Sequence, residues 1–298
     1  MNNYSFYYGA NIRYADVTNI VLEKCVKDNT VEIPDSDEER SELFIDPAHG
    51  YKKSIFIINN KTNAVQEYYI NQHICFDLEK GFDYYDDPVQ YLEKIHSQIK
   101  LKHGSMTDEY PEQLLAVKYL NKDAKVLEIG GNVGRNSCVI ATLLEDEKNL
   151  VVLEPSHLFS ALLIDNRDSN GFQFNVERSA LSNVSLIQKN WNTIPSDVVL
   201  PGYTKVNTIT FPELEAKYQI TFDTLVCDCE GALYYILYND PNILTNIKMV
   251  IIENDYGDIE HKNFVDSLFS LFDLECVYQE AGGWGPCYDC FYQVFVRP

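Results

Sequence analysis

Acidic and small residues alternate at one place in the chain, in an order that suits ligand binding: Glu128-x-Gly130-x-Asn132-x-Gly134. An apolar run precedes this motif and a segment of helical character, 137–144, follows it, which predicts a strand, a tight turn and a helix. The two glycines suit positive φ angles or close backbone approach, where a Cβ atom would collide. The turn leaves N–H groups free at the start of the helix, so it favours a ligand with negative or polar edges.

A further acid, Glu154, closes the next predicted strand, 150–154, and stands 26 residues after Glu128 (154 minus 128). An acid at this point can accept hydrogen bonds from both ribose hydroxyls of a nucleoside that lies across the glycine-rich turn. Acids at strand ends are common for reasons of solvation alone, but the spacing from the first motif favours a nucleoside-binding site.

Two more acids, Asp228 and Glu230, stand at the end of the predicted fourth strand, 225–228. Ligands bind at the carboxyl ends of parallel strands. A carboxylate at that edge can act as a general base, and these two acids are the first candidates for such a role. Asp255 and His261, just past the fifth predicted strand, are second choices, and His261 is better interpreted as a surface residue.

Several stretches resemble one enzyme family. The first motif, with its acid first and Asn132 in the middle, resembles motif I of the class I S-adenosylmethionine (SAM) methyltransferases. Its form E-I-G-G-N-V-G is most similar to the FkbM-type enzymes, whose usual form is D-V-G-A-N-I-G. The segment V-L-E-P-S at 152–156 is similar to their F-E-P segment, and A-L-S at 180–182 is similar to the segment that follows their third strand.

The block Asp228-Cys229-Glu230-Gly231 resembles the K-I-D-V-E-G-A-E block that marks FkbM-type enzymes. Val226 stands where the family often has Lys, and Leu233 stands where it has the second Glu. The polar contacts that those residues make in relatives are therefore absent here, which leaves the acceptor open.

The resemblance covers about residues 106–298 and implies an α/β fold, with a Rossmann-like class I methyltransferase sheet and an antiparallel last strand. It implies a SAM-dependent O-methyltransferase that acts on a hydroxyl of a sugar or glycan, with Asp228 and Glu230 as catalytic residues. The resemblance also implies that adenine contacts Ser179 or Ala180, without deciding between the two. The residues that would hold SAM are Glu128, Gly130, Asn132, Gly134, Asn136, Glu154, Pro155, Ser179, Ala180 and Asp228.

Two other classes of function stay open, an NAD-dependent oxidoreductase and a non-catalytic SAM- or nucleotide-binding protein on a methyltransferase fold. A dinucleotide fingerprint has glycine where this chain has Asn132, which argues against the oxidoreductase. The intact acids and glycines of the motifs argue against a decayed binding protein.

A magnesium site is a further hypothesis. Some sugar and catechol O-methyltransferases hold Mg²⁺ with an acid after the fourth strand and an acid–amide pair after the fifth. In this chain Asp228, Glu253 and Asn254 occupy those places, with Asp255 beside them. These are hard oxygen ligands, although the FkbM-type resemblance does not itself require a metal.

The elements that must position these residues alternate between strand and helix from about residue 106 onward, which predicts a parallel sheet. Residues 1–105 do not follow this pattern and predict a small α+β module that selects the acceptor or mediates self-association. A turn-rich linker is expected at 81–88. A helix at 111–120 would cover the SAM pocket, with the polarity of Glu112 interpreted as ordinary for a helix entry. The segment 186–210 appears irregular and long, and such insertions tend to lie at the ligand edge.

The composition of the chain bears on its binding partners and its cellular compartment. The net charge is −21, with 45 acids against 24 bases and no basic run, which opposes binding to nucleic acid. No apolar run is long enough to span a bilayer and no signal peptide is visible, so we expect a cytoplasmic protein with no membrane partner. We expect the eight cysteines to be reduced thiols, and a single C-x-x-C pair at 287–290 is weak evidence for zinc.

Overall fold

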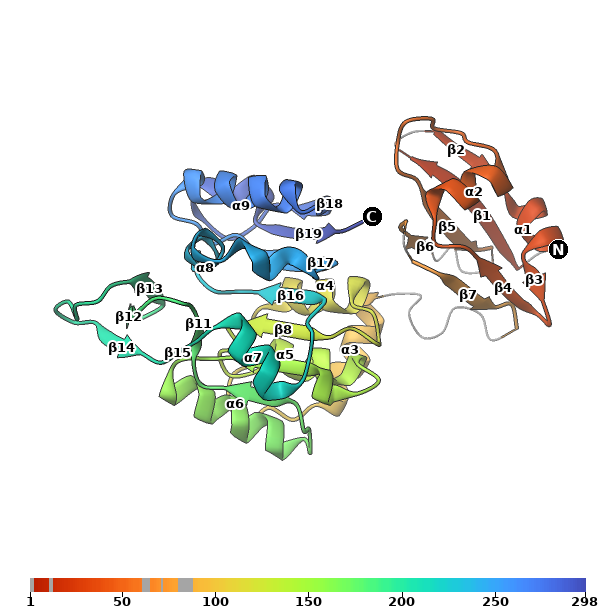
Figure 1. The fold of residues 1–298 in the computed structure, drawn as a ribbon. Coiled ribbons are helices and arrows are strands. Elements are labelled where there is room, and N and C mark those ends of the chain that lie inside the picture. The colour runs from red at the N-terminus through yellow and green to blue at the C-terminus, as the bar shows by residue number, and fades with distance from the viewer. Residues whose placement is uncertain (1–2, 11–12, 61–64, 71, 80–87) are drawn as a thin grey trace. The chain divides into compact units, whose positions relative to one another are not determined.

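The computed structural model describes residues 3–10, 13–60, 65–70, 72–79 and 88–298 (Figure 1). The chain forms two compact units, Met1–Tyr91 and Leu92–Pro298. The boundary predicted near residue 105 falls inside the second unit, and the role of the first unit stays a prediction. The linker predicted at 81–88 lies almost entirely outside the described residues. No helix in the described ranges is long and apolar enough to cross a membrane.

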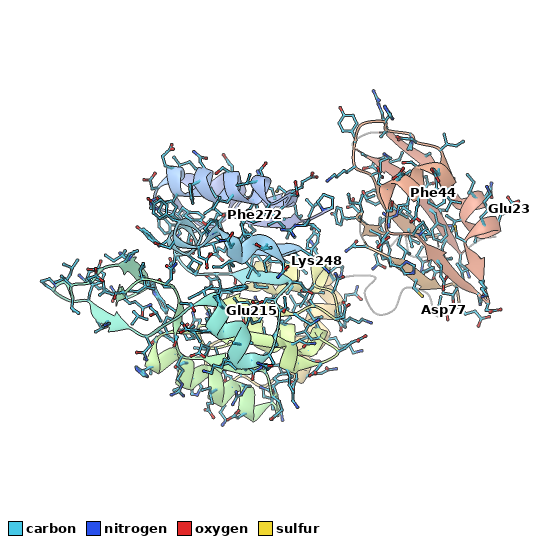
Figure 2. All side chains as sticks on the ribbon, in the orientation of Figure 1. Glu23, Phe44, Asp77, Glu215, Lys248 and Phe272 are labelled. Carbon is cyan, nitrogen blue, oxygen red and sulfur yellow. The ribbon has the colours of Figure 1, made fainter. Side chains whose placement is uncertain are left out.

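The first unit combines a sheet of order β2-β1-β5-β6 with a sheet of order β3-β4-β7. Its elements are β1 (Tyr4–Ala10), β2 (Arg13–Asp16), α1 (Thr18–Lys24), β3 (Val26–Lys27), β4 (Thr30–Ile33), α2 (Asp37–Phe44), β5 (Ser54–Asn59), β6 (Val65–Tyr68) and β7 (Ile74–Asp77). Alternate residues of β1 and β5, such as Phe6 and Ile57, are fully buried, as the period of two in a strand requires. Phe44, at the end of α2, adds to this core (Figure 2).

The strands β6 and β7 lie close together in the sequence but belong to different sheets. After β6, the backbone N–H of Tyr69 donates to the side-chain oxygen of Gln72 at 2.7 Å instead of to a neighbouring strand. A side chain that satisfies a nearby backbone group competes with the sheet in this way.

The second unit is organised around a seven-stranded sheet of order β10-β9-β8-β16-β17-β19-β18. Neighbouring strands from β10 to β17 are parallel, and β19 inserts antiparallel between β17 and β18. This confirms the predicted Rossmann-like sheet with an antiparallel last strand. The strands are β8 (Val126–Ile129), β9 (Leu150–Leu153), β10 (Asn175–Glu177), β16 (Thr224–Cys227), β17 (Met249–Glu253), β18 (Glu275–Glu280) and β19 (Tyr292–Val296).

Helices cover both faces of this sheet. The α-helices are α3 (Pro88–Gln98), α4 (Tyr110–Tyr119), α5 (Arg135–Leu143), α6 (His157–Ser169), α7 (Phe211–Tyr218), α8 (Leu233–Asn239) and α9 (Ile259–Leu271), and 3₁₀ turns lie at Glu147–Asn149, Pro241–Thr245 and Gly285–Cys290. One apolar core joins Leu127 of β8 with buried residues of α7, α8 and α9, such as Leu214, Leu237 and Phe269. The residues of β8 that alternate with Leu127 face the side on which α5 lies.

The segment expected to be irregular, 186–210, forms a small antiparallel sheet instead. It contains β12 (Leu186–Lys189), β13 (Asn192–Pro195) and β14 (Thr204–Val206), in the order β13-β12-β14. The short strands β11 (Ala180–Leu181) and β15 (Thr208–Ile209) pair in parallel at its base. Polar and apolar residues do not alternate regularly in this segment, so the sequence pattern did not predict the antiparallel strands.

Glu128 stands in β8 on the side of α5 and is only 3% exposed. Its carboxylate accepts a hydrogen bond from the Ser137 hydroxyl at 2.5 Å. Burial raises the pKa of Glu128 to about 8, and the hydrogen bonds from Ser137 and Asn136 only partly oppose this rise. Glu128 is therefore a buried acid that the fold tolerates mainly in its neutral form.

Replacing Glu128 by Gln should make the stability of the chain less dependent on pH. The folded-state pKa of Glu128 lies above its ordinary value, so the contribution of this residue to stability is fully present below about pH 4.5 and falls as the pH rises toward 8. Over that window the wild type should lose up to about 1.4 kcal/mol per pH unit relative to Glu128→Gln. Urea unfolding between pH 5 and 8 measures the difference, with the exposed Glu145→Gln as the control. Parallel pH profiles of the wild type and Glu128→Gln would contradict the prediction.

Candidate functional site

The glycine-rich turn packs directly on the loop that follows β16. Gly130 has φ +100°, and a Cβ atom built on it would lie 1.6 Å from the backbone oxygen of Asp228. Only glycine fits at this point, because the obstacle is backbone rather than a movable side chain. Gly134, at φ +85°, is the residue from which α5 begins. Between the two glycines Asn132 has φ +47°, a conformation that Asn adopts more readily than most residues.

Glu154 connects the end of β9 to this turn. Its carboxylate accepts the backbone N–H of Asn132 at 2.9 Å and that of Ser156 at 2.8 Å. The residue is 6% exposed, and burial raises the pKa of Glu154 to about 7 against the opposing effect of these two hydrogen bonds. Each carboxylate oxygen keeps further acceptor capacity toward a ligand.

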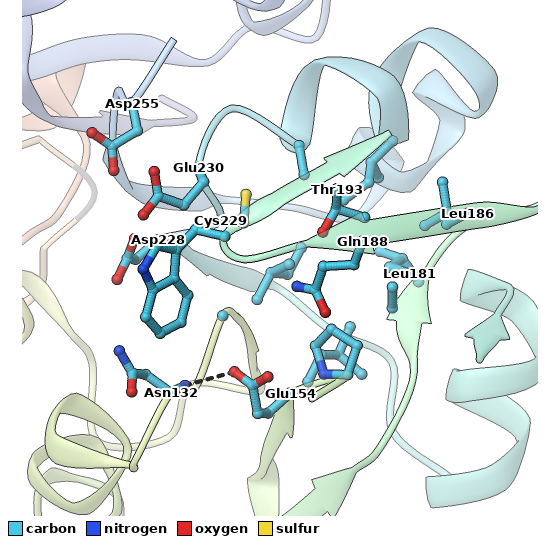
Figure 3. A pocket seen from close by; sticks show the side chains of 18 of the residues that line it. Asn132, Glu154, Leu181, Leu186, Gln188, Thr193, Asp228, Cys229, Glu230 and Asp255 are labelled. Atoms are coloured by element: carbon cyan, nitrogen blue, oxygen red, sulfur yellow. Dashed lines mark hydrogen bonds between the residues drawn. The ribbon is translucent and has the colours of Figure 1, made fainter. Parts of the chain in front are cut away.

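A cavity of about 230 Å³ opens at the carboxyl ends of β8, β9 and β16. Figure 3 shows the carboxyl groups of Asp228, Glu230 and Asp255 on one side of it, and Leu181 and Leu186 on the other. The insertion adds Gln188, Trp191 and Thr193 to the wall, as expected for a segment at the ligand edge. The predicted site residues that line this cavity are Gly130, Asn132, Glu154, Pro155, Ala180, Asp228, Glu230 and Glu253.

Four residues predicted to hold SAM do not line the cavity: Glu128, Gly134, Asn136 and Ser179. Glu128 is buried beside α5, Asn136 is a buried residue within that helix, and Gly134 is the residue before it. The hydroxyl of Ser179 donates to Glu177 at 3.0 Å, whereas its neighbour Ala180 faces the cavity. The structure thus distinguishes Ser179 from Ala180, which the sequence left together, and places the other three residues outside the lining of the cavity.

Acidic side chains gather on one side of the cavity, which we call its inner end, and form two groups that share Asp228. One group joins Asp228 to Glu109 and Glu112, and the other joins it to Glu253 and Asp255. Within each group one carboxylate oxygen per residue lies within 4.8 Å of the others. Glu109 is held by Arg135 at 2.5 Å. In both groups hard oxygen atoms are gathered where a cation or a hydrogen-bond donor could bind.

This convergence makes ionisation costly. Burial, followed by the negative charge of Glu253, raises the pKa of Asp228 well above its ordinary range. Burial likewise raises the pKa of Glu112 well above its usual value. Burial and the charge of Glu253 raise the pKa of Asp255 to about 8. A positively charged ligand would relieve this repulsion, so the inner end of the cavity favours cations.

The loop after β16 holds its acids in a tight conformation. Glu230 has φ +52° and Gly231 has φ +75°, so two successive residues are left-handed. Strained backbone of this kind persists where the surrounding structure enforces it, and it occurs often at functional sites. A Cβ atom on Gly231 would lie 3.2 Å from the backbone oxygen of Asp255. The close approach of these two loops brings Glu230 and Asp255 to the same side of the cavity (Figure 3).

Asn254, predicted as a metal ligand, is fully buried and does not line the cavity. Its amide nitrogen donates to the backbone oxygen of Cys290 at 2.7 Å and to the side chain of Gln293 at 3.0 Å. The amide thus joins the end of β17 to the region of β19, and Asp255 stands with Asp228 and Glu253 in its place. His261, a second-choice base, stacks on Tyr234 with ring centroids 3.6 Å apart and also lies outside the lining.

The sequence analysis did not identify Glu109 as a site residue, and it interpreted Glu112 only as a polar residue at a helix entry. Glu109 precedes α4 with φ +56°, and its side chain also lies 3.3 Å from the amide nitrogen of Asn132. Glu112 is 5% exposed, which ordinary helix-entry polarity does not explain. The signal in the sequence was the acid pair flanking Pro111, and nothing local shows that α4 packs against α5, β17 and β19.

No family model matches the chain, and no curated protein matches it. Solved structures show similarity at low identity. An O-methyltransferase from Bacillus cereus in complex with SAH is 16% identical with a TM-score of 0.39, and the match covers 71% of this chain and 90% of that chain. The O-methyltransferase TomG from Streptomyces achromogenes, in complex with SAM, is 15% identical with a TM-score of 0.39, over 71% of this chain and 90% of that one.

The ribosomal protein L11 methylase from Lactobacillus delbrueckii subsp. bulgaricus is 11% identical with a TM-score of 0.42, and the match covers 65% of this chain and 78% of that chain. The similar structures named here are methyltransferases, and two of them contain SAM or SAH. At these identities and scores the fold of the second unit rests on its own strand order, which is that of a Rossmann-like methyltransferase sheet.

Proposed function

We propose that the chain is a SAM-dependent methyltransferase. The observation that carries this proposal is the position of Glu154, whose carboxylate is bonded to the glycine-rich turn at Asn132. A cavity lined by both residues leads from there to Asp228. A nucleoside across the turn would meet an acid for its ribose at one end and a group of carboxylates at the other.

Different lining residues would contact the ribose, the adenine and the methionine end of SAM. Glu154 would accept hydrogen bonds from the ribose hydroxyls, and Ala180 and Leu181 would contact the adenine. Asn132 and the group of Glu109 and Asp228 lie where the charged methionine end would reach. When bound, SAM supplies a methyl group made electrophilic by its positively charged sulfonium.

The acceptor in this proposal is a hydroxyl of a sugar or glycan. A hydroxyl is a poor nucleophile, so one of the carboxylates that line the cavity must take its proton, and Asp228 and Glu230 are placed for this. Trp191, 48% exposed on the cavity wall, offers an aromatic face to a sugar ring, and Gln188 and Thr193 offer hydrogen bonds. These side chains support the O-methyltransferase proposal over a pocket for an apolar acceptor.

The residues at the cavity do not form the acid–acid–amide set expected for Mg²⁺. The amide nitrogen of Asn254 donates to Cys290 and Gln293, its Oδ1 atom has no hydrogen-bond partner, and the residue lies outside the lining of the cavity. The carboxylates of Asp228, Glu253 and Asp255 alone resemble an oxygen site. We therefore assign proton removal to the side chains of the chain itself and no step to a metal.

Calorimetry should detect binding of SAM and S-adenosylhomocysteine with micromolar dissociation constants, roughly −8 kcal/mol. Glu154→Ala should weaken binding by about 1–3 kcal/mol through loss of the hydroxyl hydrogen bonds. The exposed Glu145→Gln serves as the control. Binding of NADH without binding of SAM would overturn the class of enzyme.

The affinity for SAM should depend on pH. The pKa of Glu154 is about 7, and its ionised form is the better acceptor for two hydroxyls, so SAM affinity should rise between pH 6 and 8. In Glu154→Gln this rise should vanish. An equal rise in the variant would assign the pH dependence to other groups.

Mg²⁺ should not stabilise the protein. A ligand that binds only the folded state raises the melting temperature, so scans in EDTA and in millimolar Mg²⁺ should coincide. Asp255→Asn and Asn254→Ala probe the two alternative ligand sets. A Mg²⁺-dependent rise that disappears in either variant would restore the metal site.

A further inference from the structure

The carboxylates at the inner end of the cavity have little compensating charge of their own. Arg135 pairs with Glu109. Within the described ranges, no ion pair with Lys, Arg or His involves Glu112, Asp228, Glu230, Glu253 or Asp255. Among these acids Glu112 and Asp255 are buried, Asp228 and Glu253 are half-buried, and Glu230 is exposed. A buried carboxylate without a positively charged partner is costly, and a ligand that supplies the charge would offset that cost.

Two of these side chains have oxygen atoms with no hydrogen-bond partner. Asp255 is 8% exposed, its Oδ1 atom is unpartnered, and the residue lines the cavity. Glu112 is 5% exposed, and its Oε1 atom is unpartnered beside Asp228. Most buried polar atoms in proteins are hydrogen-bonded. The unpartnered oxygens therefore point to a ligand that donates hydrogen bonds and carries positive charge.

SAM would complete only one of the two groups. It carries a sulfonium and an ammonium against one carboxylate, and its methionine end would reach the group of Glu109, Glu112 and Asp228, next to the glycine-rich turn. Asp255 and Glu253 belong to the other group, and Glu230 lies on the same side of the cavity (Figure 3). The second group would therefore be free to bind the acceptor.

The surroundings of the second group suit an organic cation better than a metal ion. Glu253 lies opposite Tyr292 in the β17–β19 register, and a hydrogen bond from Trp284 reaches Asp255. Asn254, whose amide oxygen would complete a metal set, is fully buried and lies outside the lining of the cavity. An ammonium group offers three hydrogen-bond donors to carboxylates and is attracted to aromatic faces.

We propose that the acceptor is an amino sugar whose ammonium group binds to Glu230, Glu253 and Asp255. This inference rests on the proposed methyl transfer to a sugar hydroxyl and narrows its substrate class. The ammonium positions the acceptor through these acids, and Trp191 and Gln188, which also line the cavity, would contact the sugar ring. A neutral sugar of the same size would leave the oxygen of Asp255 without a partner and should bind poorly.

The test compares two probes that differ in charge, glucosamine and N-acetylglucosamine. Each is titrated into the full chain loaded with S-adenosylhomocysteine, at neutral pH, by calorimetry. Glucosamine should bind at least about tenfold more tightly than N-acetylglucosamine, the loss expected when a buried charged group goes unpaired. Glu230→Gln and Asp255→Asn, which keep shape and remove charge, should each weaken glucosamine binding by about tenfold or more. Glu260→Gln, an exposed acid at the start of α9, is the matched control and should leave binding unchanged.

Equal binding of the two sugars, or no binding of glucosamine, would overturn the proposal. Loss of glucosamine binding in Glu260→Gln as well would also overturn it, because a general effect of negative charge would then explain the result. Titration of S-adenosylhomocysteine into the same variants keeps the two proposals apart. If the cofactor fails to bind the wild type, the methyltransferase assignment fails, and titration of glucosamine into the cofactor-free chain still decides the ammonium site.

Discussion

The site depends on one close approach, that of Gly130 to the backbone oxygen of Asp228. A Cβ atom on Gly130 would lie 1.6 Å from that oxygen, so the turn after β8 and the loop after β16 are in backbone contact. This contact places the turn that would receive a nucleoside beside the acid that would face the reacting group. Glu154 then fixes the turn from the other side through the N–H of Asn132.

From this contact follows the electrostatic character of the cavity. With the backbone of β8 and β16 so close, the side chains at their ends and at the ends of α4 and β17 share one small volume. The pKa of Asp228 rises because burial and the charge of Glu253 act together. The chain keeps these acids together although they repel one another, which is understandable if cationic ligands occupy the cavity in use.

The sequence could predict the site residues that belong to local motifs. Gly130, Glu154 and Asp228 follow predicted strands at fixed spacings, and the strand order confirms the sheet that these spacings implied. Glu109, Glu112 and the exchange of Asn254 for Asp255 depend on how separate elements pack, which no local pattern records. Ser179 and Ala180 show the same limit, since the bend at Ser179 turns its hydroxyl to Glu177 and leaves Ala180, the first residue of β11, to line the cavity.

We propose that a nucleoside cofactor lies along the carboxyl ends of β8, β9 and β16, between Glu154 and Asp228. A crystal structure of the chain with S-adenosylhomocysteine tests this placement most directly. We expect both ribose hydroxyls within hydrogen-bond distance of Glu154, the adenine against Ala180 and Leu181, and the sulfur directed toward Asp228. A ligand bound outside this cavity, or one whose ribose makes no contact with Glu154, would contradict the placement.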